Sequence, residues 1–128
     1  MDHLDKKIEE AARRLLSSER ILLATHEDPD ADGLSAMLAV MLWLKGQGKE
    51  VVAYVLGELP EHLKFLPGLD SLRRDIPEGE YDLLVGFDYA DFRRLGLDKW
   101  VEERPGLAIL TFDHHPEGRQ KGEFTVID

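Results

Sequence analysis

The sequence predicts an α/β protein with a doubly wound, mainly parallel sheet of about five strands and helices on both faces. Short apolar runs that suit buried strands alternate with segments of helical periodicity. Acidic residues and histidines follow three of these runs, at the points where the strands would end. The chain has 128 residues, 43% of them hydrophobic, which suits one domain with a substantial core.

Five apolar runs predict the strands, and they lie at residues 20–25, 51–56, 81–87, 107–112 and 124–127. Apolar residues from Leu4 to Leu15 recur at helical spacing and predict an amphipathic helix that ends near Ser17. The nearly all-apolar segment 34–44 is too long for a typical strand and is followed by glycines, so we expect a helix there. We also expect short helical turns and loop over 60–72 and a short helix over 97–103.

Composition excludes several classes of protein. No cysteine is present, which rules out disulfide scaffolds, thiolate metal sites and cysteine nucleophiles. No apolar run reaches the roughly 18 residues that span a bilayer, and the charged first residues are unlike a signal peptide, so we expect a cytoplasmic protein without a membrane partner. The net charge of −10 argues against binding to a long nucleic acid duplex.

Acids and histidines gather after three predicted strands. His26, Asp30 and Asp32 follow the first strand, Asp88 follows the third, and Asp113, His114 and His115 come at the end of the fourth. In open α/β sheets, ligands bind outside the carboxyl ends of the strands, near the point where the strand order reverses. We therefore expect these three groups to converge in one crevice.

These residues allow several interpretations. Turn formation and helix capping explain a single aspartate such as Asp32, but not three aspartates (Asp28, Asp30 and Asp32) and a histidine within seven residues. A calcium loop of the EF-hand type is rejected, because Ala39 stands where a bidentate glutamate is required. A mixed set of imidazoles and carboxylates suits intermediate cations such as Mn²⁺. Two such ions roughly 3.5–4 Å apart, bridged by Asp88, would form a phosphoryl-transfer site.

Three segments resemble the motifs of one family. Residues 25–33, 86–96 and 113–115 are similar, in this order, to motif I, motif II and the signature motif of the DHH phosphoesterase superfamily. Residues 56–68 and the helix before motif I resemble the oligoribonuclease and pAp phosphatase (nanoRNase) branch. The resemblance spans nearly the whole chain and implies a DHH-type catalytic domain over residues 1–128.

The resemblance also implies an activity and residue roles. It implies a hydrolase that cleaves phosphate esters of short nucleotides with two Mn²⁺ ions, for which Mg²⁺ or Co²⁺ would be substitutes. His26 and Asp30 would hold the first ion, Asp32 and His114 the second, and Asp88 would bridge both. His115 would face the substrate phosphate as a ligand orienter or proton donor, and Asp113 would support the imidazoles.

Members of this family carry a further aspartate motif and a C-terminal substrate-binding domain downstream of the signature. Because the present sequence stops at Asp128, we expect a truncated domain that is inactive or weak alone. Three alternatives stay open: a RecJ-like single-strand exonuclease, a family II pyrophosphatase-like enzyme, and a catalytically silent metal-binding fragment. Since the helix over 34–44 is apolar nearly all round, we also expect a homodimer through Val40 and Trp43.

Overall fold

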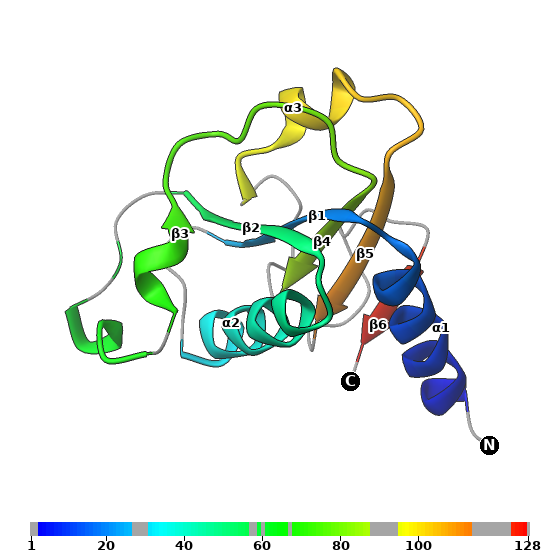
Figure 1. The fold of residues 1–128 in the computed structure, drawn as a ribbon, viewed down its shortest axis with the longest axis horizontal. Helices are drawn as coiled ribbons and strands as arrows, with labels where there is room; N and C mark the ends of the chain where they lie inside the picture. The colour runs from blue at the N-terminus through cyan, green and yellow to red at the C-terminus, as the bar shows by residue number, and fades with distance from the viewer. Residues whose placement is uncertain are drawn as a thin grey trace.

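The computed structural model of the chain describes residues 3–26, 31–56, 59, 61–66, 68–87, 95–113 and 124–127. These residues form one parallel sheet with helices on both faces (Figure 1), as the sequence predicts. No helix within this part of the chain has the length and apolarity that crossing a membrane requires.

The sheet has six strands in the order β3-β2-β1-β4-β5-β6, and every neighbouring pair is parallel. From β1 the chain moves outward to β3, returns to the centre, and moves outward again from β4 to β6. The strand order therefore reverses between β1 and β4. The strands are β1 (Arg20–Thr25), β2 (Glu50–Val55), β3 (Leu72–Arg73), β4 (Leu83–Phe87), β5 (Ala108–Asp113) and β6 (Phe124–Ile127).

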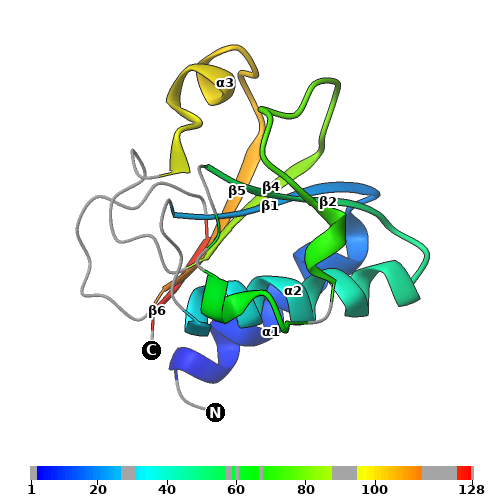
Figure 2. The same cartoon turned by 90° about the vertical axis from the view of Figure 1, so that its left-hand side faces the viewer.

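Two long helices cover one face of the sheet. α2 (Ala31–Gly46) packs on β1, β2 and β4, while α1 (His3–Ser17) packs beside β6. The short α3 (Asp98–Glu102) lies over the opposite face, as the views in Figure 1 and Figure 2 agree. Two 3₁₀ turns, Glu61–Leu63 and Leu69–Ser71, occupy the segment expected to contain helical turns.

The core divides into two clusters because successive strand residues point to opposite faces of the sheet. In β1, Ile21 and Leu23 pack in the cluster beneath α1 and α2. Leu22 and Ala24 pack on the other side, in the cluster that includes Trp100 of α3. β1 is thus buried on both faces, which explains its continuous apolar run rather than an alternating one.

Three details differ from the sequence-based expectations. β3 was not expected, because two residues carry no periodic signal. α2 begins at Ala31, so Asp32 lies inside its first turn and does not precede the helix as a cap. By its spacing Leu42 falls on the same helical stripe as Leu34, Leu38 and Met41, which are buried, but it is itself 49% exposed.

Candidate active site

Three strand ends meet at one edge of the sheet. Thr25, the last residue of β1, is paired with Phe87, the last residue of β4. Phe87 is paired in turn with Phe112, one residue before the end of β5. The residues that follow these strands therefore leave neighbouring positions on the carboxyl edge. This edge borders the point where the strand order reverses, which is the usual ligand position in open α/β sheets.

A buried hydrogen bond joins the ends of the two central strands. The Oγ1 hydroxyl of Thr25 donates to the backbone carbonyl of Phe87 over 2.7 Å. Thr25 is fully buried, and Phe87 is nearly so. Because His26 and Asp88 come next in the chain, this bond ties together the backbone from which both side chains depart.

Aromatic packing continues this arrangement from β4 to β5. The rings of Phe87 and Phe112 are stacked, with centroids 5.5 Å apart and an interplanar angle of 20°. The pair lies directly before the segments that contain Asp88 and the signature motif. The ends of all three strands are thus connected by side-chain contacts as well as by the sheet's own hydrogen bonds.

His26 is the one predicted ligand whose side chain the structure describes. It follows β1 directly and is 6% exposed. Neutral imidazole is the commonest metal ligand among side chains, and burial at a strand end restricts its freedom before any ion binds. The position and burial of His26 therefore fit a ligand at this edge.

The structure tests the other predicted site residues only in part. Asp32 lies in the first turn of α2, and Asp113 ends β5, so the backbone of both lies at or near the same edge. Their side chains, and the whole of Asp30, Asp88, His114 and His115, lie outside the described residues. Among the residues whose side chains are described, no group of three or more metal-binding side chains gathers. The ligand set therefore stays a prediction.

Gly96, the last residue of the segment that resembles motif II, has a backbone conformation and a close neighbour that both favour glycine. Its φ of +70° lies in the left-handed region, which favours glycine. A Cβ at this position would lie 2.8 Å from Cδ2 of Leu56, which directly follows β2. A side chain at residue 96 would therefore be strained and also crowded by Leu56.

The part played by Thr25 was not predicted from the sequence, where it was only the end of an apolar run and the first residue of the segment that resembles motif I. The sequence feature that could have indicated this role is a hydroxyl side chain directly before His26, the histidine of motif I. Its partner, the carbonyl of Phe87, is 62 positions away in the sequence. That contact follows only from the order of the strands.

Comparison with known proteins defines the class of this fold and site. Residues 20–127 match the DHH family, N-terminal domain. The chain therefore belongs to the DHH family.

Two similar proteins extend this result. The chain is 32% identical over 111 residues to the bifunctional oligoribonuclease and PAP phosphatase NrnA of Thermus thermophilus; this match includes 84% of the present chain and 32% of that protein. The crystal structure of an exopolyphosphatase-related protein from Bacteroides fragilis superposes with a TM-score of 0.82 at 20% identity, over 96% of this chain and 38% of that one. The chain thus spans about a third of the length of these relatives, and the second likeness supports the fold alone.

Proposed function

We propose that this chain is the catalytic domain of a metal-dependent phosphoesterase that hydrolyses phosphate esters of short nucleotides. The observation that carries the proposal is the junction of β1 and β4, where buried His26 leaves a strand end bonded to the strand that leads into Asp88. The likeness to an oligoribonuclease and PAP phosphatase supports the substrate class.

Two Mn²⁺ ions are the proposed cofactors. His26 and Asp30 would hold the first ion, Asp32 and His114 the second, with Asp88 shared between them. The buried imidazole of His26 and the proposed aspartates would together offer nitrogen and oxygen donors, a set that suits Mn²⁺ better than purely oxygen-binding cations. When bound, the ions would supply a nucleophile at neutral pH and neutralise charge on the phosphoryl group.

The remaining residues of the signature would act on the substrate and on the ligands. His115 would donate a hydrogen bond or a proton at the phosphate, a role that contributes roughly 10²–10⁴-fold to turnover. Asp113 would accept a hydrogen bond from a ligating imidazole and so fix its tautomer and orientation. Because Asp113 is the last residue of β5, its backbone is held by the sheet.

Calorimetric titration of Mn²⁺ separates these roles. Asp88→Ala should weaken binding most, because a shared carboxylate serves both ions and its loss leaves two like charges less screened. His115→Ala is the matched control, since it removes a neighbouring polar group that would face substrate and should leave Mn²⁺ affinity nearly unchanged. Equal affinity of wild type and Asp88→Ala would contradict the shared ligand, and weaker metal binding by His115→Ala would contradict its role at the substrate.

A comparison of substrates distinguishes the proposed activity from its alternatives. With Mn²⁺ present, we expect any hydrolysis by this chain to be weak and to favour pAp and a ribodinucleotide over pyrophosphate and long single-stranded DNA. Preference for long single strands would favour an exonuclease, and preference for pyrophosphate would favour a pyrophosphatase. Tight Mn²⁺ binding without hydrolysis of any of the four would favour a silent metal-binding domain.

A further inference from the structure

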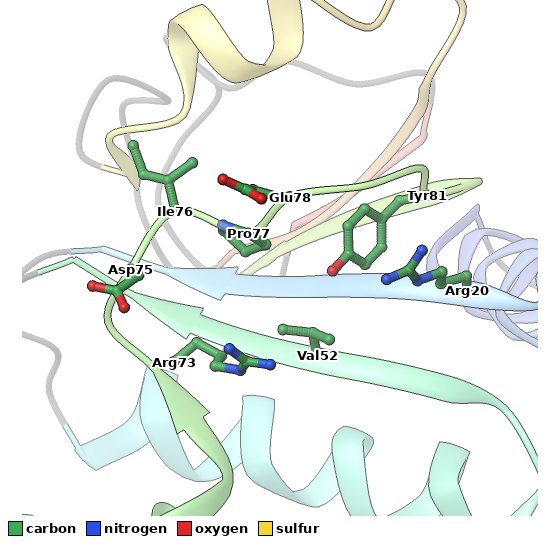
Figure 3. A pocket seen from close by; sticks show the side chains of 8 residues that line it. All are labelled: Arg20, Val52, Arg73, Asp75, Ile76, Pro77, Glu78 and Tyr81. Atoms are coloured by element: carbon green, nitrogen blue, oxygen red, sulfur yellow. The ribbon is translucent and has the colours of Figure 1, made fainter.

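A cavity lies on the α3 side of the sheet, beneath the segment that connects β3 to β4. Its volume is about 390 Å³, within the range of roughly 300–1,000 Å³ that small-molecule sites occupy. Val52 of β2 forms its floor, and the segment between β3 and β4 forms its opposite wall (Figure 3). The cavity runs along the strands: Arg20 begins β1, whereas Arg73 is in register with Tyr54 and through it with Ala24, one residue before the end of β1.

The cavity exists because the connection from β3 to β4 contains no helix. Residues 74–82 connect β3 to β4 without regular structure. The connection from β1 to β2, in contrast, is the helix α2, which covers the other face of the sheet. The segment is nevertheless held in place, since Nε1 of Trp100 donates a 2.6 Å hydrogen bond to the carbonyl of Pro77. The space beneath it is therefore preformed.

Two guanidinium groups point into this cavity from different strands, Arg20 from β1 and Arg73 from β3 (Figure 3). Three contacts position Arg20. Its Nε lies 3.4 Å from a carboxylate oxygen of Glu50, and its guanidinium lies 4.7 Å from the ring centre of Tyr81. Gly79 allows this placement, because a Cβ there would lie 3.1 Å from Nη1 of Arg20.

Arg73 has unused hydrogen-bonding capacity. Within the described part of the chain, no hydrogen bond or ion pair involves its side chain. The hydroxyl of Tyr81 points toward the same space as the two arginines (Figure 3). These three groups offer several N–H and O–H donors in the fork geometry that suits phosphate.

The cavity also carries negative charge. Asp75 and Glu78 line it, and Figure 3 shows the carboxylate of Asp75 at the end away from Arg20, with Arg73 between them. A simple anion would use only the arginines. A molecule that carries a phosphate at one end and hydroxyl groups at the other matches both the arginines and the carboxylates, because hydroxyls donate hydrogen bonds to carboxylates.

We propose that this cavity is a binding site for a small phosphate monoester bearing hydroxyl groups, of the size of a pentose phosphate. Arg20, Arg73 and Tyr81 bind the phosphate, and Asp75 accepts hydrogen bonds from the hydroxyls. The site is distinct from the proposed metal centre, because none of the proposed metal ligands is among the described residues that line the cavity.

Calorimetry with ribose 5-phosphate tests the proposal. The chain is first treated with EDTA, so that no metal ion at the carboxyl edge binds the phosphate. Arg73→Gln should weaken binding by roughly tenfold or more, the loss expected when a charge-assisted hydrogen bond is removed. Arg74→Gln is the matched control, because Arg74 is exposed and adjacent to Arg73 but is not among the residues that line the cavity. The affinity of this variant for ribose 5-phosphate should equal that of wild type.

Amide chemical shifts locate the ligand without any variant. Ribose 5-phosphate should shift the signals of Val52 and Gly79 and leave those around His26 unchanged. Inorganic phosphate should bind more weakly, and ribose should not bind. The proposal is overturned by absent binding, by equal affinity of the two arginine variants, by inorganic phosphate binding as tightly as the ester, or by shifts centred on His26.

Discussion

Thr25 and Phe87 are joined by a 2.7 Å hydrogen bond between the threonine hydroxyl and the phenylalanine carbonyl. The bond crosses from the end of β1 to the end of β4, and both residues are buried. Burial withholds water from the carbonyl, so the hydroxyl supplies a hydrogen bond at the point where the ladder of the two strands ends. The backbone positions before His26 and Asp88 are consequently fixed relative to each other.

Replacing Thr25 with valine should lower the free energy of unfolding by about 1–3 kcal/mol. Valine keeps the shape of threonine but leaves the buried carbonyl of Phe87 without its hydroxyl donor. Urea unfolding measures this change. Thr25→Ser retains the hydroxyl and serves as the control, with a smaller loss from one missing methyl group. A valine variant as stable as wild type would show that the bond does not hold these strand ends together.

Replacing Gly96 with alanine should destabilise the chain more than replacing Gly106 with alanine. Both glycines have positive φ, +70° and +87°, so each substitution costs about 1–2 kcal/mol in backbone conformation. Only the Cβ at residue 96 meets a neighbour, at 2.8 Å from Leu56, whereas nothing lies within 4 Å at residue 106. Equal midpoints of urea unfolding for the two variants would show that Leu56 moves aside without cost.

The sequence predicts most of this fold because the strands are buried on both faces. Uninterrupted apolar runs mark β1 and β4 clearly, and the intervening helices imply parallel crossovers. α2 was predicted as a helix, and the stripe that contains Met37, Leu38 and Met41 is buried as its spacing indicates, except at Leu42. A helix that is apolar nearly all round has no polar stripe that marks the edge of its buried face, so the exposure of Leu42 does not follow from the sequence.

The site was predicted from motifs that occur after strands, and the ends of β1, β4 and β5 do lie at one edge of the sheet, as strand ends do in parallel sheets. The residues of the site stay a prediction. The contact of Thr25 with Phe87 depends on β4, rather than another strand, lying beside β1. The cavity on the other face depends on Arg73 being brought beside β2 by the two-residue strand β3. Neither arrangement follows from local periodicity, because each requires the order of the whole sheet.

Association through α2 stays a prediction, and the structure identifies which residue should test it. Trp43 is 42% exposed on the outer side of this helix, next to exposed Leu42, while Val40 partly packs against the core. Trp43→Glu should therefore turn the expected homodimer into a monomer without disturbing the core, as measured by light scattering over a range of concentrations. Phe65→Glu is the control, because Phe65 is 77% exposed but lies outside α2. A wild-type monomer at high concentration would contradict the prediction.

Tyr54 gives the stability of the fold a dependence on alkaline pH. It is fully buried in β2, and its hydroxyl has no hydrogen-bond partner among the described residues. Burial raises the pKa of the Tyr54 phenol above 10.0, and the negative charge of Asp75 raises it further. The folded state therefore holds the phenolic proton more tightly than the unfolded state does. The resulting stability is fully present below pH 10 and is lost as the pH rises through the pKa of the folded state.

Tyr54→Phe removes both the unpartnered hydroxyl and this titration. At pH 8 the variant should equal wild type or exceed it by about 1 kcal/mol, because no buried hydrogen bond is lost. Above pH 10 the advantage of the variant should grow, since only the wild-type unfolded state gains stability by releasing the proton of residue 54. Urea unfolding at pH 8 and pH 10.5 measures the difference. Tyr81→Phe is the matched control, because it removes the same hydroxyl from a residue that lines the cavity. If the gain in the free energy of unfolding over wild type grows equally in both variants, the loss of stability at alkaline pH does not come from Tyr54.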